Sequence, residues 1–197
     1  MITLPPVSTN GDIRLLSIDP GSDNLGLSLF TLNPRDGRIT SLQATTYTSR
    51  KLNMDKNIEL AHGERVSRIM AHRENLKRIF SETDPFEVVC ESPFFTMRRP
   101  SAYGALSELL SLIRTTLIEH YPSVPFIIVD PPTVKKAVGA KGNGDKDVVR
   151  KAVLALTDLN YMGTTKLEEL DEHSMDSIAV GYWRVKQIQK ELEDDPK

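Results

Sequence analysis

The stretch LLSIDPGSDNLGLSLF, residues 15–30, constrains the fold more than any other part of the chain. Its apolar start predicts a buried strand that ends at Asp19. Pro20–Asp23 contains the residues of a tight turn, and a second strand of alternating apolar and small or polar residues begins at Gly26. The pattern therefore predicts a hairpin with a carboxylate at the end of its first strand.

Two interpretations of this carboxylate stay open from the stretch alone. The strand behind Asp19 fixes its position, and a carboxylate at the edge of a sheet can hold a cation that faces a phosphate. Alternatively, Asp19 only helps to form the turn, because Asp-Pro-Gly is a favourable turn sequence. The remaining elements decide between the two.

Composition narrows the class of protein. A chain of 197 residues, 39% of them hydrophobic, suits one domain with a sizeable core. We expect a flexible arm over residues 1–10, the domain over 11–190 and an acidic tail over 191–197. No apolar run is long enough to span a membrane, and a net charge of −2 means that any nucleic acid is bound through local patches. The single cysteine, Cys90, is expected in the core and fits a reducing cytoplasm. The lack of targeting signals fits a bacterial or viral origin.

The other periodicities predict an alternation of strands and helices. After the first hairpin, the elements are a strand at 38–48, a helix at 58–80, a strand at 85–90 followed by Glu91, a helix at 100–120, a strand at 125–129, and helices at 133–138, 146–156 and 171–193. Strands that alternate with helices pair in parallel with the first strand. The predicted fold class is therefore α/β, a mixed sheet of three antiparallel strands and then two parallel strands, flanked by helices on both faces.

Four polar side chains are expected to meet at one edge of this sheet. Asp19 and Glu91 end neighbouring parallel strands, where open α/β sheets place their sites, and the last helix adds His173 and Asp176 from one face. Carboxylates this close repel each other unless a cation joins them, and oxygen ligands with one nitrogen suit Mg²⁺ or Mn²⁺. Two such ions are the standard arrangement for attack of water on a phosphodiester. Taken singly, Glu91 is equally well a strand-end charge, and His173 is more often a surface residue.

The loop before the 100–120 helix contains residues suited to nucleic acid. It holds Phe94 and Phe95 beside Arg98 and Arg99. Aromatic and arginine side chains together suit base stacking and phosphate contact, unless the phenylalanines fold into the core. The 100–120 helix itself is apolar over most of its girth, so it is either deeply buried or covered by another subunit.

A second loop, at residues 139–144, is rich in glycine and has lysines around it. It lacks the Gly-Lys-Ser/Thr ending of a P-loop, which excludes nucleotide binding of that kind. Backbone amides and lysines nevertheless remain good phosphate ligands. We therefore expect this loop and its flanking lysines to contact a phosphate backbone.

These motifs resemble those of the RuvC-type Holliday junction resolvases, a family with the ribonuclease-H-like fold. The resemblance extends over residues 14–186 and keeps the family's order and spacing. It rests on four motifs: IDPGS at 18–22, VVCE ending at Glu91, the lysines from Lys135 to Lys146, and HSMDSIA at 173–179. No single motif is decisive, but the four together are specific.

The resemblance implies a catalytic site with two Mg²⁺ (or Mn²⁺) ions. The family's four metal-binding positions correspond to Asp19, Glu91, His173 and Asp176, and many members have Asp where His173 stands. Lys146 is expected to assist catalysis beside the cut phosphate. From the loops and the resemblance together, the residues expected to bind DNA are Phe94, Arg98, Arg99, Lys135, Lys136, Lys141 and Lys146.

The resemblance also implies a substrate and an assembly. The family acts as a homodimer on four-way DNA junctions, nicks two opposed strands and leaves 5′-phosphate ends, and the 100–120 helix matches its interface. Alternatives are a broader nuclease for flaps and Y-forks, a module that binds branched DNA without cutting it, and an actin- or sugar-kinase-like ATPase. That ATPase class also has an Asp-x-Gly-Ser/Thr loop, but it needs two lobes and this chain has one.

Overall fold

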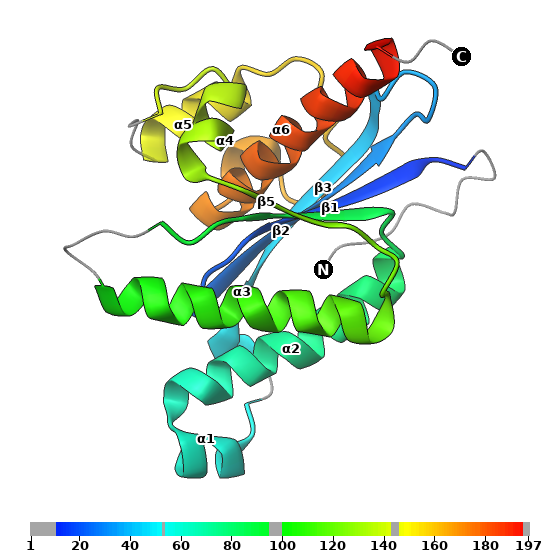
Figure 1. The fold of residues 1–197 in the computed structure, drawn as a ribbon. Coiled ribbons are helices and arrows are strands. Elements are labelled where there is room, and N and C mark those ends of the chain that lie inside the picture. The colour runs from blue at the N-terminus through cyan, green and yellow to red at the C-terminus, as the bar shows by residue number, and fades with distance from the viewer. Residues whose placement is uncertain (1–10, 53, 95–99, 143–145, 195–197) are drawn as a thin grey trace.

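The computed structural model describes residues 11–52, 54–94, 100–142 and 146–194. One five-stranded sheet forms its centre, in the strand order β3-β2-β1-β4-β5 (Figure 1). The strands are β1 (Ile13–Asp19), β2 (Asn24–Leu32), β3 (Ile39–Thr48), β4 (Glu87–Glu91) and β5 (Phe126–Val129). The helices are α1 (Lys56–His62), α2 (Glu64–Thr83), α3 (Pro100–His120), α4 (Pro131–Ala137), α5 (Lys146–Leu154) and α6 (Glu172–Asp194), with 3-10 turns at Ser49–Lys51 and Leu167–Glu169.

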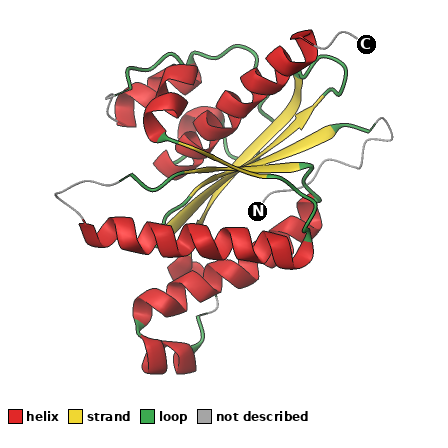
Figure 2. Cartoon of the chain, in the orientation of Figure 1, coloured by secondary structure: helices red, strands yellow, loops and turns green. Residues whose placement is uncertain are grey.

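The pairing of the strands follows the predicted order. The first three strands form an antiparallel meander, and β4 and β5 lie parallel to β1. The parallel register aligns Ile18 of β1 with Cys90 of β4, so these two strands end beside each other. Helices cover both faces of the sheet (Figure 2). The predicted α/β mixed sheet is confirmed.

Alternation along the strands builds one core on each face of the sheet. Leu15 of β1 packs with residues of α4, α5 and α6, whereas the next residue, Leu16, packs with residues of α2 and α3. Cys90 is fully buried in the second core, as predicted. Asp19 points to the same face as Leu15, toward α6, because side chains two and four residues apart on a strand share a face.

The prediction of one continuous helix over residues 58–80 is wrong. Gly63, with a φ of 88°, ends α1 and precedes α2. Glycine adopts this left-handed conformation without the steric cost that a side chain would add. No residue of α1 is buried, and Leu60 is 87% exposed, so the apolar stripe of α2 stops at the break. α1 projects away from the sheet (Figure 1).

The structure can be compared with the predicted domain limits at the two ends of the chain. The arm predicted over residues 1–10 lies outside the described residues, as do residues 195–197. α6 continues to Asp194, so the first part of the predicted acidic tail is helical. Among the helices that the structure describes, none combines the length and the apolar character needed to cross a membrane.

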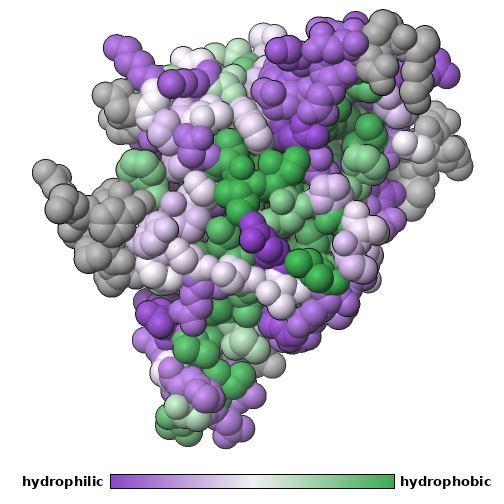
Figure 3. Space-filling view, viewed as in Figure 1, coloured by the Kyte–Doolittle hydropathy of each residue, from purple (hydrophilic) through white to green (hydrophobic). Residues whose placement is uncertain are grey.

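α3 buries one face and leaves the other uncovered. Leu109, Ile113 and Leu117 are fully buried in the core on the α2 side of the sheet. The open face of α3 includes Tyr103, 39% exposed, and Ile118, 53% exposed. Apolar side chains also gather across the middle of the surface seen in Figure 3, where the edge strand β5 lies between α3 and α4. A second subunit on the open face of α3 stays a prediction.

A buried ion pair fastens α6 to β4. Arg184 of α6 donates from Nε to Oε1 of Glu87 at 2.6 Å and from Nη2 to Oε2 at 3.0 Å. The two side chains are only 12% and 5% exposed. Arg184 also reaches the exposed Glu191 at 2.7 Å. Because the first pair is buried and bidentate, we infer that it holds the middle of α6 in place over the sheet.

We expect Glu87→Gln to lower the free energy of unfolding by about 3 kcal/mol, because it leaves Arg184 buried without its main counter-charge. Glu191→Gln removes the exposed partner of the same arginine and should cost less than about 1 kcal/mol. Urea denaturation at neutral pH measures both values. Equal losses of unfolding free energy in the two variants would contradict the inference that the Arg184–Glu87 pair holds α6 in place.

Candidate active site

Two carboxylates lie at the carboxyl ends of neighbouring parallel strands. Asp19 is the last residue of β1 and Glu91 is the last residue of β4. The residues directly before them, Ile18 and Cys90, are register partners. Asp19 is 8% exposed and Glu91 is half-buried. The buried apolar strands therefore hold both carboxylates at one edge of the sheet, as the sequence predicted.

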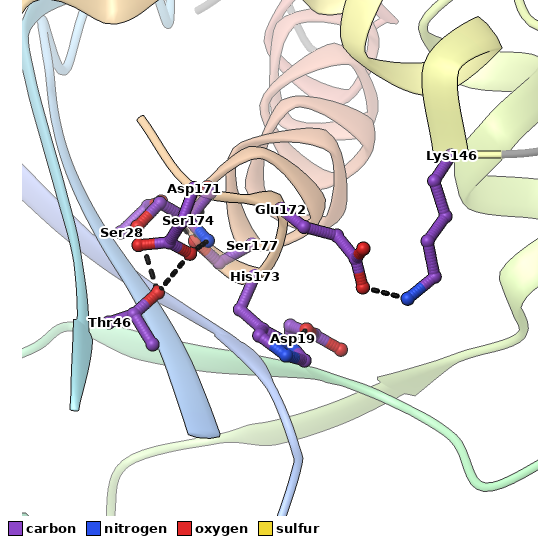
Figure 4. A network of polar contacts seen from close by, with 9 residues as sticks. All are labelled: Asp19, Ser28, Thr46, Lys146, Asp171, Glu172, His173, Ser174 and Ser177. Carbon is purple, nitrogen blue, oxygen red and sulfur yellow. Dashed lines mark hydrogen bonds and ion pairs between the residues drawn. The ribbon is translucent and has the colours of Figure 1, made fainter. Parts of the chain in front are cut away.

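α6 brings two further polar groups to this edge. Nδ1 of His173 lies 2.8 Å from Oδ2 of Asp19 (Figure 4). An ionised carboxylate only accepts hydrogen bonds, so Nδ1 carries the proton in this pair. Asp176, on the same helix, lines a pocket of about 200 Å³ together with Glu91 and two lysines.

α6 lies close to the sheet because small side chains line the contact. Ser17 donates to the carbonyl of Ser177 at 2.8 Å, and the hydroxyls of Ser28 and Ser177 are 2.6 Å apart. Gly181 leaves room for Phe30 and Ser17, since a Cβ at this position would collide with both. Every one of these buried hydroxyls has a partner, so the close approach leaves no polar group unsatisfied.

Burial and mutual repulsion raise the pKa values of the carboxyl groups. The pKa of Glu91 rises to about 8 through burial and the charges of Asp19 and Asp176. The pKa of Asp176 rises to about 6 through burial and the charge of Asp19, although Lys146 acts in the opposite direction. The hydrogen bond to Asp19 raises the pKa of His173 above 6.5, against the effect of its burial. The site therefore concentrates more negative charge than its basic groups neutralise.

The four predicted metal-binding residues share this edge but fall into two groups. Asp19 and His173 bond to each other, whereas Glu91 and Asp176 line the pocket. In the part of the chain that the structure describes, no three His, Cys, Asp or Glu side chains are arranged as a metal-binding cluster. Coordination of an ion by all four residues therefore stays a prediction.

Lysines line the pocket, and one of them is held by a residue that the sequence analysis missed. Lys135 of α4 and Lys146 of α5 both line it. Lys146 forms an ion pair with Glu172, the first residue of α6 (Figure 4). The position of Glu172 directly before the HSMDSIA motif could have indicated that it lies near the site. Nothing in the sequence pairs it with Lys146. Lys136 and Lys141 are exposed, and their contact with DNA stays a prediction.

The loop after β4 carries the aromatic residue predicted to meet bases. Phe94 is 60% exposed, so its ring is not packed in either core. Phe95, Arg98 and Arg99 lie outside the described residues. An exposed aromatic ring near the carboxylate edge suits base stacking, and contact of Phe94 with DNA stays a prediction.

The sequence matches no protein-family model, but solved structures share its architecture. RuvC of Thermus thermophilus is 20% identical, with a TM-score of 0.60 over 92% of this chain and 97% of RuvC. The yeast mitochondrial Holliday junction resolvase Ydc2 is 13% identical, with a TM-score of 0.64 over 92% of this chain and 81% of Ydc2. The fowlpox virus resolvase, solved with Holliday junction DNA, is 12% identical, with a TM-score of 0.53 over 89% of this chain and 99% of the resolvase. This chain therefore has the fold that RuvC shares with these Holliday junction resolvases.

Proposed function

We propose that this chain is a divalent-metal-dependent endonuclease that resolves four-way (Holliday) DNA junctions. The observation that carries the proposal is the gathering of Asp19, Glu91, His173 and Asp176 at one edge of the sheet, in the fold of the junction resolvases. Thermus thermophilus RuvC and the fowlpox virus resolvase were both solved with Holliday junction DNA, which supports the choice of substrate.

The charge of the site fits a bound cation. The pKa values of Glu91 and Asp176 are raised partly because like charges crowd them, and a divalent ion among the carboxylates would remove that repulsion. Oxygen ligands with one imidazole suit Mg²⁺ or Mn²⁺. Asp19, Glu91, His173 and Asp176 would hold two such ions, which when bound activate water and polarise the phosphate.

The chain's own basic residues would bring the phosphate to this edge. Lys135 and Lys146 line the same pocket as Glu91 and Asp176, so a DNA strand drawn to the lysines lies beside the carboxylates. Lys146 would then exchange its ion pair with Glu172 for the phosphate. The lysines thus bind and orient the DNA, and the carboxylates stay available for the cation.

The symmetry of the substrate indicates two copies of the site. A four-way junction presents two opposed strands, and one chain offers one set of carboxylates. We place the second subunit on the open face of α3, where Ile118 is exposed. Each subunit would make one nick and leave a 5′-phosphate end, while Phe94 stacks on a base at the branch point.

We expect Asp19→Asn, Glu91→Gln and Asp176→Asn each to slow nicking of a synthetic four-way junction by about 10²- to 10⁴-fold, because each removes a charge that would hold the ion. Junction binding should persist, since the lysines are intact. Cleavage and gel-shift assays, with and without Mg²⁺, measure the two properties. Asp158→Asn is the control: this carboxylate faces Lys186 at 2.9 Å, and the variant should cut at the wild-type rate.

The same assays separate this proposal from its rivals. Equal cutting of flaps or Y-forks and of four-way junctions would indicate a broader branched-DNA nuclease. Binding without cutting under any divalent ion would indicate a non-catalytic module. ATP hydrolysis that needs no DNA and survives Asp19→Asn would favour the ATPase class. Loss of junction binding in all three carboxylate variants would count against the assigned roles.

Phe94→Ala should lower the cleavage rate by about tenfold while the free energy of unfolding changes by less than about 1 kcal/mol, because an exposed ring contributes base stacking rather than core packing. Phe86→Ala is a matched control. Phe86 is also 60% exposed, but it precedes β4 whereas Phe94 follows it. Single-turnover cleavage and urea denaturation measure the two quantities. If Phe94→Ala cleaves at the wild-type rate, Phe94 is not part of the DNA interface.

Without divalent ions, Glu91→Gln should stabilise the protein at pH 9 by about 5 kcal/mol, the free energy of the shift in the pKa of Glu91. The pKa of Glu91 is about 8 in the folded protein against an ordinary value of 4.5, so the folded state holds this proton more tightly. The free energy of unfolding of the wild type therefore falls as the pH rises from about 4.5 to about 8. The glutamine variant has no proton to lose at this position, so its free energy of unfolding does not fall for this reason. Urea denaturation at pH 5 and pH 9 measures the difference, which should nearly vanish at pH 5.

Mn²⁺ should restore the missing stability of the wild type at pH 9, since it replaces the lost proton as the counter-charge. Glu91→Gln should gain less from the same addition. The surface variant Glu191→Gln, whose carboxylate is exposed, serves as the control and should respond like the wild type. A wild-type protein that gains no stability from Mn²⁺ or Mg²⁺ would contradict the metal site.

A further inference from the structure

A row of three residues crosses the sheet directly under the start of α6. The strand registers place Asp19 of β1 opposite Gly26 of β2, and Gly26 opposite Thr46 of β3. The first turn of α6 lies across this row. His173 bonds to Asp19 at one end, and Asp171 accepts a hydrogen bond of 2.6 Å from Oγ1 of Thr46 at the other (Figure 4).

The middle of the row has to be a glycine. A Cβ on Gly26 would collide with the backbone carbonyl of His173. Glycine inside a strand weakens it, and a close approach of another backbone is one of the reasons for its presence there. Gly26 therefore lets the backbone of α6 lie directly on β2, between its contacts with β1 and β3.

Asp171 bonds to the helix through both of its carboxylate oxygens and to the strand through one of them. Its Oδ1 accepts from the backbone N–H of Ser174 at 3.0 Å, which is the geometry of a helix N-cap, and its Oδ2 accepts from the hydroxyl of Ser174 at 3.2 Å. The hydroxyls of Thr46 and Ser174 are 2.9 Å apart. An N-cap alone would only stabilise the start of the helix. This one also accepts a hydrogen bond from Thr46 and so connects the helix to β3.

We propose that Thr46 and Asp171 are positioning residues for the active site. They hold the first turn of α6 in register over the row, so that His173 stays within hydrogen-bond distance of Asp19 and Asp176 stays beside Glu91. Neither residue needs to touch DNA. The role in cleavage rests on the proposed function, whereas the effect on the Asp19–His173 pair does not.

The test compares Thr46→Val with Thr46→Ser and Thr45→Val in the whole 197-residue chain. Valine keeps the shape of threonine and suits a strand, but it cannot donate to Asp171. Serine restores the hydroxyl. Thr45 is the matched control, because neighbouring residues of a strand point to opposite faces of the sheet and its side chain therefore points away from α6.

Three measurements are made on each variant: kcat and KM on a four-way junction, the affinity for Mn²⁺ alone by calorimetry, and the ring ¹⁵N shifts of His173 at alkaline pH. We expect Thr46→Val to lower kcat by about ten- to a hundredfold at nearly constant KM, since a misplacement of about 1 Å costs on the order of 10²-fold. Mn²⁺ should bind more weakly, and the imidazole should no longer keep its proton mainly on Nδ1. Thr46→Ser and Thr45→Val should resemble the wild type.

Other outcomes overturn the proposal. One is a Thr46→Val variant that keeps the wild-type kcat and the wild-type His173 shifts. Another is a Thr46→Ser or Thr45→Val variant that is impaired as much as Thr46→Val. If Thr46→Val unfolds at the assay temperature, Asp171→Ser tests the same link, because serine caps a helix well but is too short to reach Thr46. A wild-type chain that cuts no branched DNA would refute the proposed function, and the His173 shifts would still decide the positioning role.

Discussion

The close contact between α6 and the sheet is the constraint on which the site depends. Small residues make this contact between the helix and the strands β1 and β2: Ser17, Ser28, Ser177 and Gly181. A larger side chain at any of these positions would lift the helix, and His173 could not stay 2.8 Å from Asp19. The hydroxyls satisfy each other in the buried contact, so the short separation does not carry the cost of unpaired polar groups. The geometry of the site is thus set by residues that take no part in its chemistry.

The same contact creates the electrostatic character of the site. Glu87 and Glu91 lie on one face of β4, and both point toward α6. Glu87 meets Arg184 and forms a paired, bidentate contact, which holds the helix. Glu91 instead is half-buried without an ion pair of that kind among the described residues, and burial together with the charges of Asp19 and Asp176 raises its pKa to about 8. A carboxyl group that is buried next to other carboxylates lowers the stability of the fold at neutral pH. Such carboxyl groups are typical of functional sites rather than of structural ion pairs.

Local periodicity was enough to predict most of the fold. The apolar strands that deliver Asp19 and Glu91, the burial of Cys90 and the helix that carries His173 all follow from residues close together in the sequence. Gly63 was the local exception, since its φ of 88° breaks a stripe that looked continuous. The contacts of Lys146 with Glu172 and of Thr46 with Asp171 were not predictable in this way. They join residues 26 and 125 positions apart, and their pairing depends on strand register and helix placement rather than on any local pattern.

The imidazole at position 173 has a consequence that a carboxylate there would not have. A histidine ligates a metal only in its neutral form, yet the hydrogen bond to Asp19 raises the pKa of His173 and favours the protonated form. The interaction that places His173 beside Asp19 therefore makes its use as a ligand dependent on pH. In its protonated form, His173 partly neutralises Asp19, the residue whose charge raises the pKa values of both Glu91 and Asp176. A cation that His173 ligates would have to displace that proton, so its apparent affinity would rise with pH more steeply than at a site built from carboxylates of ordinary pKa alone.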